Sequence, residues 1–262
     1  MAERWEHEQV IRTVPLLIVT MAASAAAQVR QTPSALDRDV AARIAGLSAG
    51  LHFETADPAE SARRRAELGK LTDRLHAEVD SYVRVALTAN ERAERVQARL
   101  RTVLAVHKPN PDYGDLPLVR IADLRAGRSM IAAYTIVRGP HDDAATIRGY
   151  RWNIDRFELA GTAGDNFAGY NMFKTELRSP LPGEFWLIAW GQAQTFNGKK
   201  VRVRVYAFDG QDFRTVWSPE DLFNATLRIA EPGFVIDEEM PFAPYERHAE
   251  YRVTVNGIVK IN

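Results

Sequence analysis

The 262-residue sequence predicts an α+β fold, in which an N-terminal helical hairpin or three-helix region precedes an antiparallel β-meander that forms an open sheet or a sandwich. The first observation is the spacing of apolar residues, which is helical over residues 28–110 and strand-like over residues 111–262. The second is a set of turn dipeptides typical of β-hairpins, all in the second region: Asn197 and Gly198, Asp209 and Gly210, Asn256 and Gly257. We therefore expect the boundary between the two regions near Asn110 and Pro111.

Residues 1–27 have the layout of a signal peptide. Residues 14–27 are apolar and uncharged and end in three alanines, as at a cleavage site. The preceding segment carries three glutamates as well as two arginines, whereas an export signal usually begins with a net positive charge. An uncleaved anchor helix and a cytoplasmic chain are the alternatives. Cleavage would leave a periplasmic or secreted protein without a stable membrane span.

The composition excludes several classes of function. Lys plus Arg and Asp plus Glu number 34 each, and removing residues 1–27 takes away two basic and three acidic residues, which leaves a net charge of +1. This balance gives no reason to expect a nucleic-acid partner. Cysteine is absent, which excludes disulfides, thiol catalysis and thiolate metal sites.

Three amphipathic helices are expected in the first region. The first covers residues 34–51, and Asp57 followed by Pro58 begins the second with a capping oxygen and a proline at the first helical position. Thr88 and Glu91 have the spacing of a capping box, which predicts that a third helix begins there. The apolar stripes of the second and third helices are expected to face the core: Leu68, Leu71, Leu75, Val79, Tyr82 and Val83, then Val96, Leu100, Val103 and Leu104.

The clearest hairpin of the second region joins residues 201–208 to residues 213–217. Valines alternate with Arg202 and Arg204 along its first strand, a pattern typical of a sheet with one face in water. Ser218 and Pro219, followed by two acidic residues, predict one short helix after this hairpin.

The second region contains a weak internal repeat. Residues 131–159 align with residues 187–215 at an offset of 56 without a gap, and four positions are identical. Residues 206–217 resemble the outer hairpin of a β-propeller blade, and residues 150–157 resemble it less closely because Asn153 and Ile154 replace Asp209 and Gly210. The region has room for about three such units, and a closed propeller needs roughly four or more. We therefore expect an open sheet or a sandwich; completion of a partial propeller by oligomerisation would need further assumptions.

The sequence contains no nucleophile elbow, no dinucleotide-binding or P-loop glycine pattern, and no paired histidines at metal-ligand spacing. We therefore expect no cofactor and no metal. His141 and Asp142 form the best polar cluster, which could hold a ligand or lie in a plain exposed turn. Residues 237–239 form the strongest acidic run, which could serve a hydrolase only with a partner such as Glu184 or Asp165.

Aromatic residues concentrate in the second region, where they either fill the core or bind a ligand. Phe185 and Trp186 are consecutive and point to opposite faces of a strand, so Trp186 is the best candidate for a surface or inter-domain contact, with Trp190 as a second binding candidate. The sequence favours an exported, non-enzymatic envelope or secreted binding module with a protein or polysaccharide partner. A hydrolase of an extracellular polymer with loop carboxylates is the alternative, a helix-mediated structural oligomer is a third hypothesis, and the oligomeric state stays open.

Overall fold

The computed structural model describes most of the chain beyond residue 56. The described ranges are 57–104, 119–124, 128–137, 143–164, 167, 169–181, 184–239 and 246–262. The expected leader over residues 1–27, the expected helix over residues 34–51, and His141 and Asp142 lie outside them. No helix within the described ranges is long and apolar enough to cross a bilayer.

Two helices precede the strands, α2 (Pro58–Thr88) and α3 (Ala93–Leu104). The predicted start of α2 is confirmed, because the Asp57 carboxylate accepts a 2.8 Å hydrogen bond from the Ala59 backbone N–H. The predicted capping box is wrong. Thr88 is the last residue of α2, where its hydroxyl accepts a hydrogen bond from the Phe157 backbone, and Asn90 takes a left-handed conformation (φ 60°) in the turn. The predicted inner face of α3 is buried in full.

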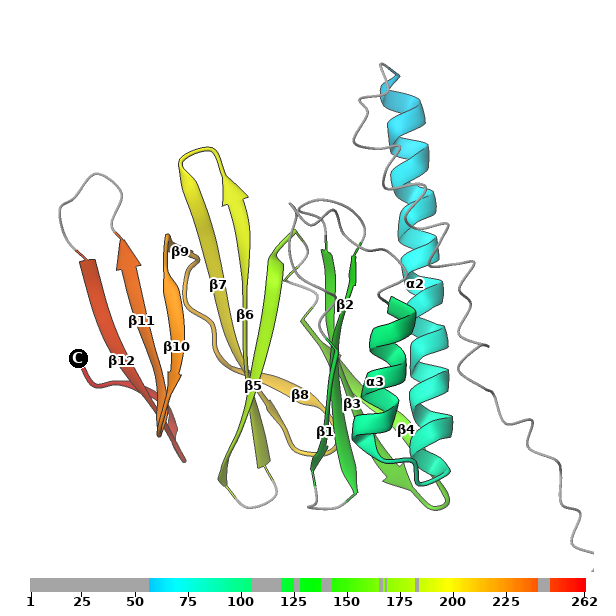
Figure 1. The fold of residues 1–262 in the computed structure, drawn as a ribbon. Coiled ribbons are helices and arrows are strands. Elements are labelled where there is room, and N and C mark those ends of the chain that lie inside the picture. Colours follow the sequence, from blue (N-terminus) through cyan, green and yellow to red (C-terminus); the bar gives the residue numbers. More distant parts are fainter. Residues whose placement is uncertain are drawn as a thin grey trace, which may run out of the picture. The chain divides into compact units, whose positions relative to one another are not determined.

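The strands form three antiparallel sheets, which we call the first, second and third sheets in chain order (Figure 1). The first contains β1 (Val119–Leu124), β2 (Ser129–Val137), β3 (Asp143–Asn153) and β4 (Arg156–Ala163). The second contains β5 (Asn171–Leu181), β6 (Glu184–Thr195), β7 (Gly198–Phe208) and β8 (Phe213–Trp217), and β9 (Leu222–Phe223) also pairs with β7. The third contains β10 (Thr226–Ala230), β11 (Gly233–Glu239), β12 (Glu246–Thr254) and β13 (Gly257–Lys260). The α+β fold class with an antiparallel meander is confirmed.

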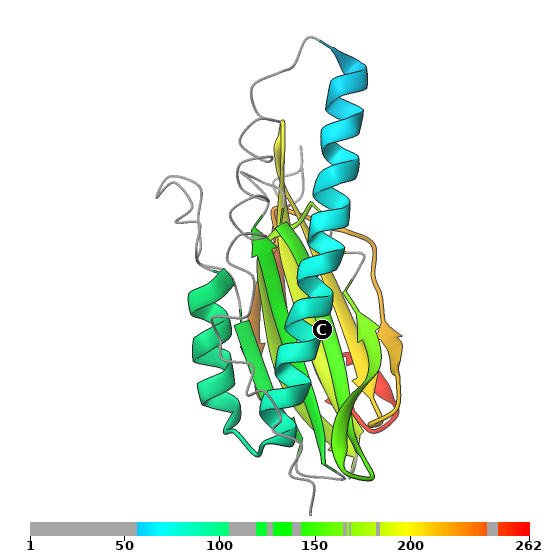
Figure 2. The same ribbon diagram turned by 90° about the vertical axis from the view of Figure 1, so that its right-hand side faces the viewer.

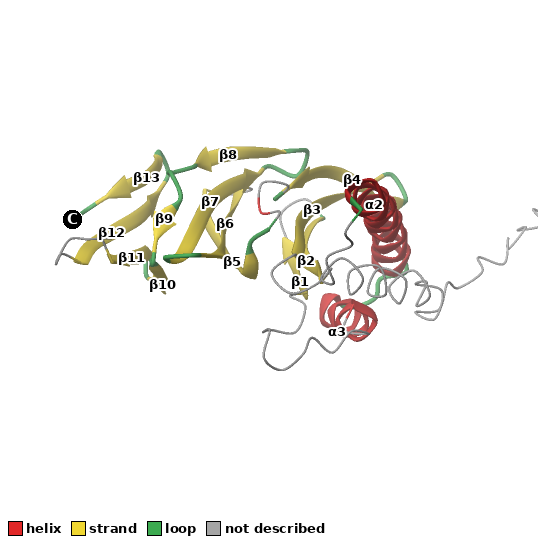
Figure 3. Ribbon diagram, turned by 90° about the horizontal axis from the view of Figure 1, so that it is seen from above, coloured by secondary structure: helices red, strands yellow, loops and turns green. Residues whose placement is uncertain are grey.

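The helices and sheets form successive layers with a hydrophobic core between each neighbouring pair. Both helices cover one face of the first sheet (Figure 2). The first and second sheets share a second core, and the second and third sheets share a third (Figure 3). The second sheet is therefore a middle layer that is packed on both faces.

Neighbouring residues of β6 show this double packing directly. Leu187 and Ala189 belong to the core toward the first sheet, whereas Trp186 and Ile188 belong to the core toward the third. Because side chains alternate along a strand, an apolar run can fill two cores at once. The expectation that this sheet has one face in water is wrong, since Arg202 and Arg204 are only partly exposed.

The segment around Asp221 supplies hydrogen-bond acceptors to these two arginines. The Asp221 carboxylate receives two 2.8 Å hydrogen bonds from Arg202 and one of 2.5 Å from the Tyr170 hydroxyl. The Arg204 guanidinium donates to the Pro219 carbonyl. The short helix predicted after Ser218 is wrong: residues 218–221 form no helix, and these contacts and the pairing of β9 with β7 hold the segment against the second sheet.

The two segments that the sequence aligns at an offset of 56 can be compared by strand register, and their common origin stays a prediction. Tyr150 pairs with Leu159 between β3 and β4, and Tyr206 pairs with Thr215 between β7 and β8, at the offset of 56. Each pair of strands also has a register shift just before this tyrosine, after Gly149 and after Val205. The register of the β2–β3 pairing differs by one residue from that of the β6–β7 pairing. Tyr150 pairs with Met130, whereas Tyr206 pairs with Leu187 and not with the residue 56 positions after Met130.

Neither outer sheet offers an apolar face on which a further sheet could pack. The helices cover the free face of the first sheet. The free face of the third sheet carries an ion-pair ladder, in which Asp237 contacts Arg228 at 3.0 Å and His248 at 2.7 Å, and His248 contacts Glu250 at 3.3 Å. The hydrogen bond to Asp237 raises the pKa of His248. Completion of a propeller ring by a second copy would displace the helices or bury this ladder, so the structure does not favour it.

Substituting Gly149 with alanine should lower the free energy of unfolding by about 1–3 kcal/mol. The added Cβ would lie 2.4 Å from the Phe208 ring, which is fully buried and stacked on Phe213. Gly69 in α2 is the matched control, because nothing lies within 4 Å of a Cβ there, and alanine should stabilise by about 0.5–1 kcal/mol. Urea denaturation measures both, and an unchanged Gly149→Ala variant would contradict the close approach of the first two sheets.

Candidate functional site

A buried polar cluster joins α2 to the first sheet. The Asp80 carboxylate accepts a 2.6 Å hydrogen bond from the Tyr150 hydroxyl and lies 3.4 Å from the Arg148 guanidinium. Burial raises the pKa of Asp80 and of Tyr150. The Tyr134 hydroxyl nearby bonds to His76 at 2.9 Å, and both tyrosines are fully buried. The buried side chains of Asp80, Tyr134 and Tyr150 anchor the helix on the first sheet.

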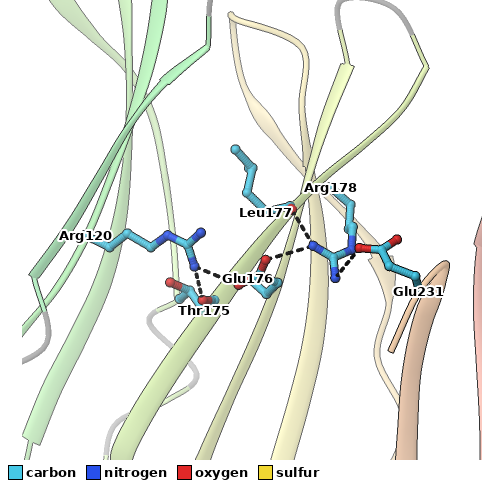
Figure 4. Close-up of polar contacts among 6 residues, drawn as sticks. All are labelled: Arg120, Thr175, Glu176, Leu177, Arg178 and Glu231. Atoms are coloured by element: carbon cyan, nitrogen blue, oxygen red, sulfur yellow. Dashed lines mark hydrogen bonds and ion pairs between the residues drawn. The ribbon is translucent and has the colours of Figure 1, made fainter. Parts of the chain in front are cut away.

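A second polar cluster connects all three sheets along one side (Figure 4). Arg120 of β1 donates to the Thr175 carbonyl and, at 3.0 Å, to Glu176 of β5. Arg178 of β5 bonds to Glu176 at 2.8 Å and contacts Glu231, before β11, at 3.3 Å. Burial would raise the pKa of Glu176, but the two arginines lower it. The alternating charges neutralise one another, so this row connects the layers and leaves no net charge for a ligand.

The carboxylates considered for hydrolysis that the structure describes have partners of their own. Asp237 belongs to the ladder on the third sheet, and Glu238 accepts a 3.0 Å hydrogen bond from the Phe223 backbone. Glu184 bonds to Arg214 and, at 3.0 Å, to the Trp186 indole N–H. Asp165 lies outside the described residues. The described part of the chain contains no group of three or more residues that could hold a metal ion.

The structure places the predicted aromatic candidates in or near the core. Trp186 is 1 % exposed and packs between the second and third sheets, so the surface alternative expected for it is wrong, and a role in binding stays a prediction. The reason is the double packing of the second sheet, which buries both members of the Phe185 and Trp186 pair to different extents. Trp190 is partly buried against the same core. His141 and Asp142 lie outside the described residues.

The most unusual exposed residue is Ile154, at the tip of the β3–β4 hairpin. Its side chain is 90 % exposed, and its backbone lies in the left-handed region (φ 54°), which is rare for a β-branched residue. A 2.6 Å hydrogen bond from the Asp155 N–H to the Asn153 carbonyl closes the turn. The equivalent position of the repeat is Gly210 (φ 88°), the residue type that such a conformation favours.

Two neighbours hold Ile154 in place. The Trp152 indole donates a 3.0 Å hydrogen bond to the Ile154 carbonyl, and the Arg128 guanidinium lies 4.8 Å from the centre of the Trp152 ring. Arg128 is itself in the left-handed region (φ 56°), and its carbonyl accepts from the Trp152 backbone. We call Arg128, Trp152 and Ile154 the β3–β4 tip. It presents an aliphatic anchor, part of an aromatic ring and an exposed guanidinium, a combination typical of binding hot spots.

The hairpin around this tip is internally braced. Glu158 accepts hydrogen bonds of 2.8 Å from Asn153 and 3.0 Å from Arg156, and these bonds lower its pKa. Sequence reasoning treated the pair Asn153 and Ile154 only as a poor match to the Asp-Gly turn. The useful signal was the mismatch itself, because a large apolar residue stands where the turn favours glycine.

Replacing Tyr150 with phenylalanine should lower the free energy of unfolding by about 1–3 kcal/mol, because Asp80 stays buried without its hydroxyl partner. Thr146→Val is the matched control on the same strand. The Thr146 hydroxyl is buried and has no hydrogen-bond partner among the described residues, so removing it should be neutral or stabilising. Chemical denaturation compares the two variants. Equal losses would contradict a specific role for the Tyr150–Asp80 bond.

Comparison with protein-family models, with curated proteins and with solved structures finds no match. The proposed function therefore rests on the geometry of the described residues and on the sequence pattern of residues 1–27.

Proposed function

We propose that this chain is an exported, non-enzymatic interaction module of the cell envelope or the extracellular space, which binds a protein partner through the β3–β4 tip. The observation that carries the proposal is Ile154, an exposed apolar side chain in a left-handed backbone conformation. Such a conformation costs of order 1–3 kcal/mol in a residue other than glycine. An exposed apolar side chain and a strained backbone both cost free energy in the isolated protein. We therefore expect Ile154 to contact a partner, which would bury the side chain. Export rests on the leader-like pattern of residues 1–27.

The surroundings of Ile154 favour a protein over a polysaccharide. Sugar binding by an aromatic residue requires an open ring face, whereas Arg128 lies over one face of Trp152 and Phe157 meets the ring at an angle of 82°. Arg128 has no acidic partner among the described residues. An aliphatic anchor beside an available guanidinium suits a partner pocket lined by apolar residues and bordered by a carboxylate.

The rest of the fold serves as a rigid support for this tip. β3 and β4 are braced from one side by α2 and from the other by the second sheet. Little conformational freedom is therefore lost when the tip binds, which increases affinity.

Ile154→Gly should stabilise the protein by roughly 1 kcal/mol, because glycine adopts the left-handed conformation without strain, and should abolish partner binding. Stability is measured by chemical denaturation. Binding is measured in cells with a photo-crosslinking amino acid at Asp155, which is exposed next to the anchor. A crosslinked adduct should form in the Ile154 background and disappear in the Ile154→Gly background.

The control places the crosslinker at Thr162, an exposed position farther along β4. Adducts from this position should be the same in both backgrounds. An adduct at position 155 that survives Ile154→Gly, or no adduct there at all, would contradict the proposal.

A further inference from the structure

A second exposed anchor lies at the tip of the β6–β7 hairpin. Phe196 is fully exposed in the two-residue loop between β6 and β7, and no other Phe, Trp or Tyr whose side chain the structure describes is exposed. Figure 1 shows that this hairpin and the β3–β4 hairpin point to opposite ends of the sheets, and Figure 2 agrees. Phe196 is therefore not part of the β3–β4 tip.

The loop that carries Phe196 is well supported. The Thr195 hydroxyl donates a 2.8 Å hydrogen bond to the Gly198 carbonyl, and the Asn224 side chain accepts a 2.9 Å bond from the Lys199 backbone N–H. A Cβ at position 198 would lie 2.4 Å from Asn224, which shows how closely the segment before the third sheet packs against the turn. The aromatic ring projects from a fixed backbone.

The hairpin behind this ring is cationic. Residues 185–208 contain four basic residues and no acidic residue. Arg202 and Arg204 face Asp221, whereas Lys199 and Lys200 have no ion-pair partner among the described residues. Two acids of another sheet lie beside the hairpin: Glu238 accepts from the Phe223 backbone, opposite Lys200, and Glu239 contacts Asn224 at 3.4 Å. No ion pair among the described residues joins either carboxylate to Lys199 or Lys200, so both ammonium groups stay available to an anionic ligand.

We propose that the β6–β7 hairpin docks the protein on an anionic lipid bilayer, with Phe196 inserted at the level of the headgroups and the two lysines contacting lipid phosphates. Aromatic side chains favour the bilayer interface, and basic residues beside them are attracted to anionic headgroups. This docking is peripheral, and it is independent of the function proposed for the β3–β4 tip.

The absence of cysteine permits a local test in the full chain. Phe196→Cys is labelled with the environment-sensitive dye NBD and mixed with vesicles of phosphatidylglycerol and phosphatidylcholine in equal parts. NBD emission should shift to shorter wavelength and increase in intensity. Vesicles of phosphatidylcholine alone should need more lipid for the same response. Because the dye reports only its own surroundings, membrane binding by another segment does not imitate this signal.

Two variants complete the test. Ile154→Cys labelled in the same way should show no spectral shift, because its hairpin points to the other end of the sheets. Lys199→Gln and Lys200→Gln, each added to the labelled Phe196→Cys chain, should raise the lipid concentration at half-response roughly fivefold. An unchanged spectrum at position 196, or an equal response at positions 196 and 154, would overturn the proposal. Equal responses to both kinds of vesicle would overturn the assignment of an anionic surface.

Discussion

The fold depends on one constraint, the burial of both faces of the second sheet. Every buried apolar side chain of β6 and β7 belongs to one of two cores, and adjacent apolar residues such as Leu187 and Ile188 therefore contribute to different layers. The first and third sheets pack against this middle layer, and the helices pack against the first. Where charges enter these layers, each meets a partner, as Arg202 meets Asp221.

Local signals made much of this fold predictable. Asp57 and Pro58 marked the start of α2, the leucine and valine stripe marked the buried face of α3, and the Asn-Gly and Asp-Gly dipeptides marked hairpins, because capping, periodicity and turn geometry act over a few residues. Contacts between distant segments were not predictable. The extended segment around Asp221 carries a helix-start pattern, and only the approach of Arg202 and Tyr170 overrides it.

The same limit applies to the candidate site. The alternation of side chains along a strand indicates that Phe185 and Trp186 point to opposite faces of their sheet. It does not indicate that another sheet covers each of those faces. Trp186 therefore looked like a surface residue and is buried. The exposed anchors Ile154 and Phe196 lie instead in turns, where no periodic pattern applies. Both face solvent from rigid hairpins, so the layered core positions the two proposed contact points without taking part in either.

Cysteine accessibility in this cysteine-free chain tests the layered arrangement of the three sheets most directly. Leu187→Cys and Ile188→Cys place single thiols at adjacent positions that are 2 % and 0 % exposed. The layered arrangement predicts that both react with iodoacetamide at least about a hundredfold more slowly than in the unfolded chain, because reaction requires opening of the structure. If one of the two reacts as fast as an exposed thiol, one face of the second sheet is in water and the layered arrangement is wrong.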